Sequence, residues 1–389
     1  MTQCSYSKTW VTVDLHNRSV GACCRTTHQD VSGEIDINNE WFTSLRKNLD
    51  GGIEDPRCTA CWQQERSIGT SLRSNGPVMH QWSKTESRVE DADLQYLEIR
   101  LGNQCDGACV YCGGNFSSKQ AKFWKIHLDI PKPVVLEPLI DETKRLIEQN
   151  KHSLNTIVFI GGEPSIMEKW YEFIDFLSGV EFSKRLTVVV TTNMNWTEKT
   201  KDRLFASMEK FLLNSGKTFN IRISGEGDEE YFRGIRKFSD YDRVLSNMHS
   251  MVEQFGDSIT YTLQPVLNGL SVYSLDDWLS KFTDIFVQRG ISAVSLHFAM
   301  LTRPGEFQTI HQGEVAVASI NKILAVIESS AIFTGKESCR RILENQKSKL
   351  IGQEPNVAML DKLAETLRAH DKILPHDWKS EDALSQLKH

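Results

Sequence analysis

The sequence predicts an α/β protein built on a parallel sheet, because short apolar segments alternate with helix-length segments between about residues 94 and 301. Two further observations accompany this pattern. The chain has 389 residues, enough for one large α/β domain with extensions. Seven of its nine cysteines fall in tight groups, at positions 23/24, 58/61 and 105/109/112. In a reducing compartment such grouping indicates metal binding rather than disulfides.

Six apolar segments are the expected strands: Leu97–Leu101, Thr156–Ile160, Thr187–Thr192, Phe219–Ser224, Ile259–Val266 and Ala293–Ala299. The expected helices between them cover about residues 134–150, 166–179, 197–214, 228–255 and 274–289. Repeated strand–helix units place helices outside a parallel sheet. We therefore expect functional side chains just after the strands, where the connecting loops gather.

The chain divides into three predicted domains along its length. Residues 1–93 are rich in turns and form a predicted cysteine-rich module, and residues 94–301 carry the strand–helix repeats. Residues 302–389 form a predicted C-terminal helical extension. Two apolar stripes there, which begin at Val317 and Met359, have the spacing of helix faces that pack against a core.

Composition and charge exclude several classes of function. The formal net charge of −6 argues against binding driven by nucleic-acid phosphates, since such binding needs a positive surface. No run of eighteen apolar residues exists, so we expect no transmembrane helix. The first ten residues lack the apolar core of a signal peptide. These features predict a cytoplasmic protein without a membrane partner.

Cys105, Cys109 and Cys112 form a C-x3-C-x2-C pattern directly after the first predicted strand of the repeats. Iron–sulfur clusters are usually held by four thiolates. A loop with three cysteines therefore predicts a cluster in which one iron is left open to chemistry. The alternative is a zinc site completed by a distant histidine. Cys339 stands apart from the groups, and we expect it to serve packing alone.

This cysteine spacing resembles the signature of the radical SAM superfamily. The resemblance implies a partial (β/α)6 barrel and a [4Fe–4S] cluster whose open iron binds S-adenosylmethionine. It also implies one-electron cleavage of S-adenosylmethionine to a 5′-deoxyadenosyl radical. Tyr111 stands where the superfamily often has an aromatic residue near the adenine, although its ring could simply cover the cluster. The polar residues 115–133, which end in Pro131-Lys132-Pro133, are expected to form a loop over the cluster.

Other motifs of that superfamily have counterparts after later strands. Gly161-Gly162-Glu163 resembles the GGE motif, which implies an ammonium group bound by the backbone edge and by Glu163. The alternative is a turn with a solvated glutamate. Asn193 resembles a rim residue that either bonds S-adenosylmethionine or holds the rim itself. Ser224 and Glu226, in Ser-Gly-Glu-Gly, are similar to a segment whose polar groups contact the ribose.

The N-terminal cysteines predict a second metal site. Its candidate ligands are Cys4, Cys23 or Cys24, Cys58 and Cys61. The Cys-x2-Cys-Trp element resembles the auxiliary-cluster region of twitch and SPASM radical SAM proteins, in a group that carries it before the barrel. The resemblance implies a second [4Fe–4S] cluster, whereas the same ligands also suit a structural Zn²⁺ ion. Full ligation would imply electron transfer or a structural role, and three ligands would leave an iron for substrate.

Taken together, these features predict a radical SAM enzyme that abstracts hydrogen from a peptide or protein substrate. A small metabolite, such as a sugar or nucleotide derivative, is the alternative substrate. A zinc-stabilised binding protein without radical chemistry is the lower alternative. The resemblance also implies an electron donor such as flavodoxin or ferredoxin.

Overall fold

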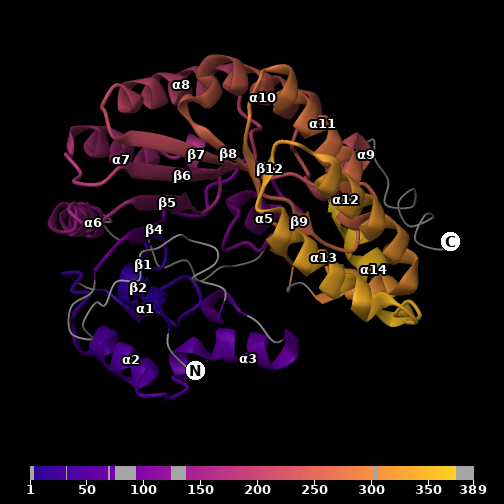
Figure 1. The fold of residues 1–389 in the computed structure, drawn as a ribbon, viewed down its shortest axis with the longest axis horizontal. Helices are drawn as coiled ribbons and strands as arrows, with labels where there is room; N and C mark the ends of the chain where they lie inside the picture. The colour runs from indigo at the N-terminus through magenta and orange to yellow at the C-terminus, as the bar shows by residue number, and fades with distance from the viewer. Residues whose placement is uncertain are drawn as a thin grey trace. The chain divides into compact units, whose positions relative to one another are not determined.

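The computed structural model describes residues 4–31, 33–68, 71–74, 93–123, 137–301 and 305–373 (Figure 1). Most of the loop expected at residues 115–133, including Pro131-Lys132-Pro133, lies outside the described residues, as does the chain beyond residue 373. The chain divides into two compact units. Unit 1 comprises residues 1–102, 129–190 and 206–218, and unit 2 comprises residues 103–128, 191–205 and 219–389.

The strands of unit 1 form one sheet in the order β6-β5-β4-β1-β2-β3. Their bounds are β1 Trp10–Asp14, β2 Ser19–Gly21, β3 Gln29–Asp30, β4 Tyr96–Arg100, β5 Thr156–Ile160 and β6 Leu186–Thr192, of which residues 186–190 belong to unit 1. β1, β4, β5 and β6 are parallel, and β2 and β3 continue the sheet as antiparallel strands. Trp10 pairs with Tyr96 and Asp14 with Arg100, so the cysteine-rich segment joins the sheet through β1.

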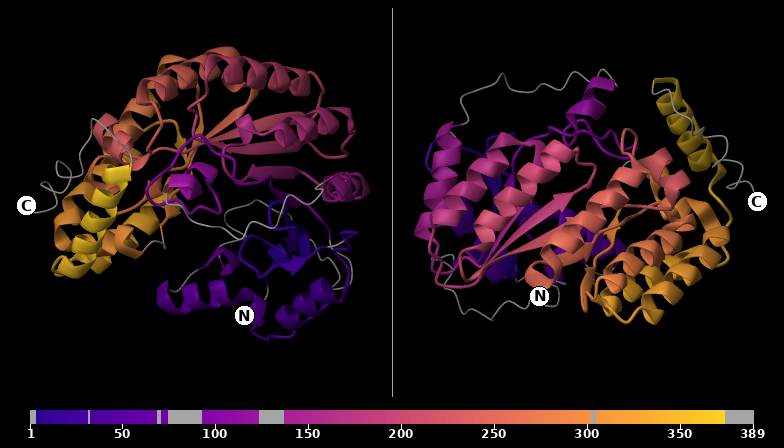
Figure 2. Two further views of the ribbon diagram at one scale, coloured as in Figure 1. Left: turned by 180° about the vertical axis from the view of Figure 1, so that it is seen from behind. Right: turned by 90° about the horizontal axis from the view of Figure 1, so that it is seen from above.

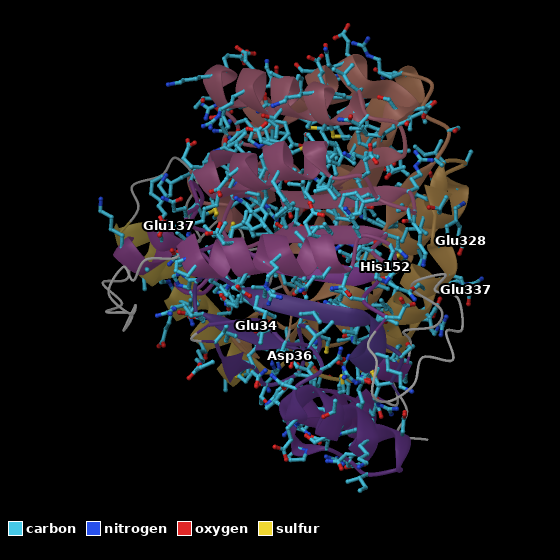
Figure 3. All side chains as sticks on the ribbon, turned by 90° about the vertical axis from the view of Figure 1, so that its left-hand side faces the viewer. Glu34, Asp36, Glu137, His152, Glu328 and Glu337 are labelled. Carbon is cyan, nitrogen blue, oxygen red and sulfur yellow. The ribbon has the colours of Figure 1, made fainter. Side chains whose placement is uncertain are left out.

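Helices of unit 1 each pack a largely apolar face against the rest of the unit. They are α1 Tyr6–Thr9, α2 Glu40–Asp50, α3 Thr59–Ile68, α6 Glu137–Gln149 and α7 Glu168–Gly179, with the short 3₁₀ helices η1 Pro56–Cys58 and η2 Pro164–Ile166. α6 contacts the N-terminal segment, because Arg145 pairs with Glu34 at 2.9 Å and Glu142 Oε2 accepts from the Ile35 amide at 3.3 Å (Figure 3 labels Glu34). α8, Glu198–Leu212, contributes residues to both units.

In unit 2 the parallel strands follow the order β12-β10-β8-β7. Their bounds are β7 Lys217–Ile223, of which residues 219–223 belong to unit 2, β8 Thr260–Leu263, β10 Val294–Leu296 and β12 Phe333–Thr334. β9 Val266–Leu267 and β11 Ala299–Met300 form a separate parallel pair. The predicted strands 259–266 and 293–299 are therefore each divided in two, the first half lying in the main sheet and the second in this pair.

The helices of unit 2 are α5 Ser118–Phe123, α9 Glu229–Ile235, α10 Tyr241–Phe255, α11 Leu275–Gln288, α12 Val317–Ser329, α13 Lys336–Leu350 and α14 Val357–Ile373. Short 3₁₀ helices η3 Gly256–Ser258, η4 Ser271–Tyr273, η5 Gly305–Phe307 and η6 Thr309–Ala316 complete it. The single helix predicted over 228–255 is wrong, because Phe238 has a φ of 68° and Asp240 caps a new helix. α12 and α13 pack together in the predicted C-terminal extension (Figure 2).

The predicted fold class is confirmed: the chain is α/β with parallel strands, and the open sheets suit a partial barrel rather than a closed one. The predicted domain boundaries at residues 93 and 301 stay predictions. None of the described helices is long and apolar enough to cross a membrane. The apolar stripe of α14 is a packing face as expected, since Leu363 and Leu367 are fully buried.

Gly161 lets two loops of unit 1 approach closely at the ends of β4 and β5. The Gly162 amide donates a hydrogen bond to the Gly102 carbonyl at 3.0 Å. A Cβ added at Gly161 would lie 2.4 Å from the Gly102 carbonyl oxygen, and the φ of Gly161 is 136°. Only glycine adopts such a backbone conformation without strain.

Gly161→Ala is therefore expected to destabilise the protein by about 1–3 kcal/mol, the usual cost of a strained backbone conformation. Chemical denaturation measures this change. Gly179→Ala is the matched control, because a Cβ there meets nothing within 4 Å. Equal stability of both variants would contradict the close approach of the two loops.

Candidate functional site

Cys105, Cys109 and Cys112 lie on the loop that follows β4, here called the cluster loop and defined as residues 103–117. None of the three forms a disulfide, and all three are half-buried. The Gly107 amide donates to Cys105 Sγ at 3.4 Å, so a backbone dipole points at this sulfur. Three grouped thiols that are neither disulfide-bonded nor fully buried are suited to bind metal.

The cluster loop is folded by its own hydrogen bonds. Asn103 Nδ2 donates to the Gly114 carbonyl at 3.1 Å, and Ser117 Oγ donates to the Gly107 carbonyl at 2.7 Å. The Ser118 amide closes the loop by donating to the Asn103 carbonyl at 2.6 Å. These bonds fix the backbone between the cysteines without using a cysteine side chain.

Asn193 holds the cluster loop from the end of β6. Its Nδ2 donates to Asp106 Oδ1 at 2.7 Å, and Asn195 Nδ2 donates to Asp106 Oδ2 at 3.1 Å. Asn193 Oδ1 in turn accepts from the Asn195 amide at 2.8 Å. The amide of Asn193 is thus engaged in holding the rim, one of the two roles expected for it.

The cluster loop also pairs with the segment that ends α9. The Ala108 amide donates to the Lys237 carbonyl at 3.0 Å, and the Val110 amide donates to the Ile235 carbonyl at 2.9 Å. This register sets Cys109 opposite Arg236. The backbone on either side of Cys109 is therefore held between two hydrogen bonds.

Tyr111, Glu226 and Arg236 form a buried hydrogen-bonded group in unit 2. Arg236 Nε and Nη2 donate to Glu226 Oε2 and Oε1 at 2.7 and 2.8 Å, and the Tyr111 hydroxyl donates to Oε1 at 2.8 Å. The Val266 amide also donates to Oε1, at 3.3 Å. Glu226 is completely buried. Burial raises the pKa of Tyr111 well above its ordinary value, and the phenol stays protonated.

The ribose contacts predicted for Ser224 and Glu226 stay predictions. Both oxygens of Glu226 accept hydrogen bonds from protein groups, so its carboxylate is engaged inside unit 2. Ser224 is half-buried at the end of β7, with its amide donating to the Thr192 carbonyl at 3.0 Å. Arg236 is a residue of this group that sequence reasoning missed, because Tyr111 lies 125 residues away and no local pattern links Arg236 to Glu226.

Glu163 belongs to unit 1 and caps η2. Its Oε1 accepts from Ser165 Oγ at 2.7 Å and from the Ser165 amide at 3.3 Å. The side chain is buried, so it is not the solvated glutamate of the alternative interpretation. The ammonium contact predicted for Gly161, Gly162 and Glu163 stays a prediction.

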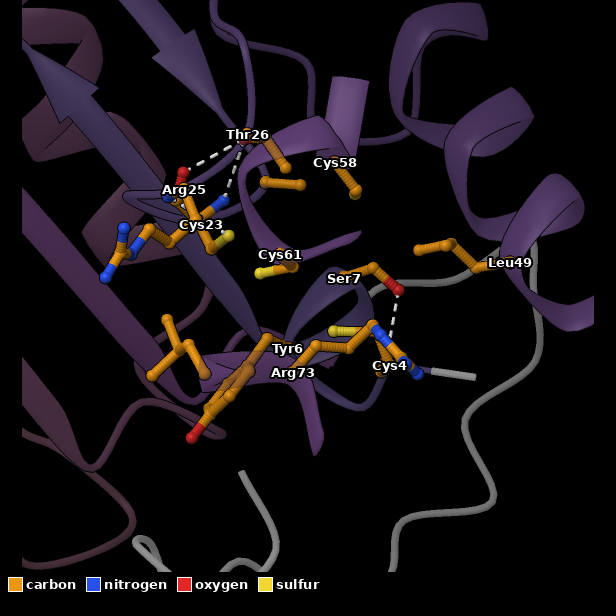
Figure 4. Close-up of a pocket in the computed structure, with 12 residues that line it drawn as sticks. Cys4, Tyr6, Ser7, Cys23, Arg25, Thr26, Leu49, Cys58, Cys61 and Arg73 are labelled. Atoms are coloured by element: carbon orange, nitrogen blue, oxygen red, sulfur yellow. Dashed lines mark hydrogen bonds between the residues drawn. The ribbon is translucent and has the colours of Figure 1, made fainter. Parts of the chain in front are cut away.

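Four N-terminal cysteines line one cavity of unit 1. Cys4, Cys23, Cys58 and Cys61 surround an empty volume of about 350 Å³, part of which is open to solvent (Figure 4). Burial raises the pKa values of Cys4, Cys23 and Cys58 to about 12, and repulsion from neighbouring cysteines of the same set adds to each rise. Cys24 is exposed and does not line the cavity, which distinguishes it from Cys23.

Local structure explains why these cysteines meet. Cys58 ends η1 and Cys61 lies in the first turn of α3, three positions on, so both face the same side. Asp55 caps η1, and its hydrogen bond from Arg57 helps to lower the pKa of Asp55 to about 2. Trp62 Nε1 donates to the Asp55 carbonyl at 2.9 Å, which fixes the start of α3.

The donor chemistry of both cysteine groups fits iron–sulfur clusters. Within the described ranges, no three His, Cys, Asp or Glu side chains are arranged to hold a single metal ion. In a zinc site each sulfur lies about 2.3 Å from the metal, which draws the ligands close together. The thiols of Cys4, Cys23, Cys58 and Cys61 suit either a cluster or a zinc ion, since thiolates accept both.

Residues 99–279 match the protein family described as the radical SAM superfamily. No curated protein matches the chain. Among solved structures, Streptococcus suis SuiB bound to S-adenosylmethionine is 12% identical, with a TM-score of 0.39 over 84% of this chain and 71% of SuiB. The radical S-adenosylmethionine methyltransferase TsrM from Kitasatospora setae is 10% identical, with a TM-score of 0.34 over 56% of this chain and 40% of TsrM. These likenesses are low, and we base the assignment on residues 99–279.

Replacing Cys23 by alanine is expected to remove the metal bound at the N-terminal site, because Cys23 lines the cavity. The adjacent change Cys24→Ala is the matched control and should retain that metal, since Cys24 is exposed. Metal analysis of the two purified variants measures this difference. Loss of metal from the Cys24 variant alone would reverse the assignment of the ligand.

Proposed function

We propose a specific reaction for this chain. Its residues 99–279 match the radical SAM superfamily, and the chain is an enzyme of that superfamily. The enzyme cleaves S-adenosylmethionine at a [4Fe–4S] cluster held by Cys105, Cys109 and Cys112, and it abstracts hydrogen from a peptide or protein. One observation carries this proposal: the cluster loop contains three cysteines outside any disulfide and no fourth cysteine. When bound, such a cluster supplies the electron that cleaves S-adenosylmethionine and leaves one iron for it.

The residues around the cluster loop keep the three thiols in place. Asp106 is held by Asn193 and Asn195, and the backbone beside Cys109 is held by the segment that ends α9. A fixed loop keeps the ligands oriented before the cluster binds, which reduces the ordering cost of binding. Ser224 offers a half-buried hydroxyl at the end of β7, and we assign it the ribose contact.

We assign the N-terminal cysteines to an auxiliary [4Fe–4S] cluster of the twitch or SPASM type. Four thiols line the cavity, so ligation would be complete, and electron transfer is favoured over direct substrate binding. β1 pairs along its whole length with β4, which ends just before the cluster loop. A structural zinc ion is the alternative occupant.

A peptide or protein substrate is supported by the resemblance to twitch and SPASM enzymes. One observation favours a small metabolite as the second candidate. The described N-terminal residues form short helices and three strands around the cysteine cavity, without a winged helix to hold a peptide. None of the nine cysteines forms a disulfide, which supports a reducing compartment such as the cytoplasm. The proposed electron donor there is a flavodoxin or a ferredoxin.

Reduction of the purified enzyme with dithionite in the presence of S-adenosylmethionine is expected to release 5′-deoxyadenosine. Chromatography measures the release. Each of the changes Cys105→Ala, Cys109→Ala and Cys112→Ala should reduce it to background. Cys339→Ala is the matched control, because Cys339 is buried and its thiol bonds the Leu296 carbonyl.

A panel of peptides and small metabolites then distinguishes the two substrate classes. Stimulation of 5′-deoxyadenosine release by peptides supports the first proposal. Stimulation by sugar or nucleotide derivatives alone would replace it with the second.

A further inference from the structure

The cluster loop pairs with the end of α9, and this pairing sets Arg236 opposite Cys109. Among the described residues, Arg236 is the one cationic residue that this pairing places opposite a proposed ligand. The bonds Ala108–Lys237 and Val110–Ile235 fix that register. Its side chain is 5% exposed, and that of its partner Glu226 is not exposed at all. The charge of a buried guanidinium is weakly screened because it has so little contact with water, so it acts strongly on neighbouring groups.

Arg236 is also fixed in orientation. Glu226 binds it through two parallel hydrogen bonds of 2.7 and 2.8 Å, a geometry specific to the guanidinium fork. Its Nη2 donates in addition to the Tyr111 hydroxyl at 3.3 Å, and Tyr111 lies two residues beyond Cys109. The three side chains thus connect the cluster loop to the end of α9 through an ion pair and side-chain hydrogen bonds, in addition to the backbone hydrogen bonds.

The backbone register sets Cys109 directly opposite Arg236, and Tyr111, two residues beyond Cys109, bonds both Arg236 and Glu226. The buried guanidinium is therefore anchored next to the segment that carries Cys109. Glu226 carries the opposite charge, so the two members of the pair act on the cluster loop in opposite directions.

We propose that Arg236 is a positioning residue that holds a fixed positive charge beside the Cys109 ligand and thereby raises the reduction potential of the cluster. The proposal rests on the proposed function, since it requires a cluster on Cys105, Cys109 and Cys112. Reduction adds one electron to the cluster, and a nearby positive charge stabilises the reduced form. Glu226 limits this effect by partly neutralising Arg236, and Tyr111 fixes the distance.

The two members of the pair are expected to act in opposite directions. Arg236→Gln removes the positive charge and should lower the midpoint potential of the cluster. Glu226→Gln leaves the charge of Arg236 uncompensated and should raise it. A change of about tenfold in the reduction equilibrium corresponds to about 59 mV for one electron. A purely structural role would move both potentials the same way or leave both unchanged.

Redox titration of the full chain, followed by the electron paramagnetic resonance of the reduced cluster, measures these shifts. The signal that changes when S-adenosylmethionine is added identifies the cluster on the cluster loop. Arg236→Lys keeps the charge and should restore most of the potential lost in Arg236→Gln. Arg233→Gln is the matched control, because Arg233 forms an exposed ion pair with Glu229 on α9.

Opposite shifts in Arg236→Gln and Glu226→Gln support the proposal. If the Arg236→Gln variant loses its iron, the Glu226→Gln variant alone tests the proposal. An unchanged or lowered midpoint potential in the Glu226→Gln variant would then overturn it. A wild-type enzyme without any signal that responds to S-adenosylmethionine would refute the proposed function instead. That outcome is read from the wild type before any variant is measured.

Discussion

The fixed backbone of the cluster loop is the constraint on which the site depends. The proposed function assigns the side chains of Cys105, Cys109 and Cys112 to metal, so other groups have to hold the loop. The bonds from Asn103 and Ser117 to backbone carbonyls close it from within, and Asn193 and Asn195 hold Asp106 from the end of β6. Because these bonds use polar groups that are largely buried, their loss would leave unsatisfied partners at high cost. The ligand positions are thus determined by residues that do not ligate.

In unit 1 the cysteines are held in place in a different way. There the proposed ligands come from three separate segments, and the sheet brings them together: Cys4 precedes α1 and β1, Cys23 follows β2, and Cys58 and Cys61 lie at η1 and α3. β1 is paired with β4 from Trp10 to Asp14, and the Asp14–Arg100 ion pair of 2.9 Å joins the ends of these strands. The N-terminal cysteine site is therefore built onto the same sheet as the GGE segment, and it is not a separately folded appendage of unit 1.

Local patterns in the sequence predicted the strands, the C-x3-C-x2-C loop and the four-cysteine set, because these depend on spacing over a few residues. Longer-range features could not be predicted in this way. The choice between Cys23 and Cys24 depends on which side chain faces Cys4 and Cys58, and adjacent residues leave that open. The break at Phe238 splits a helix that periodicity alone continues. Arg236 lies 125 residues beyond Tyr111, and only the fold reveals that Glu226 is an internal partner of both.

The central claim is that two separate cysteine groups each hold a four-iron cluster. Iron, sulfide and zinc content of the anaerobically purified protein tests it most directly, with wild type measured beside the Cys105→Ala/Cys109→Ala/Cys112→Ala variant. We predict about eight iron atoms per chain in the wild type, as two four-iron clusters require, and about half of that in the variant. Zinc at both sites, with no iron even after reconstitution, would contradict the account and favour a zinc-stabilised binding protein.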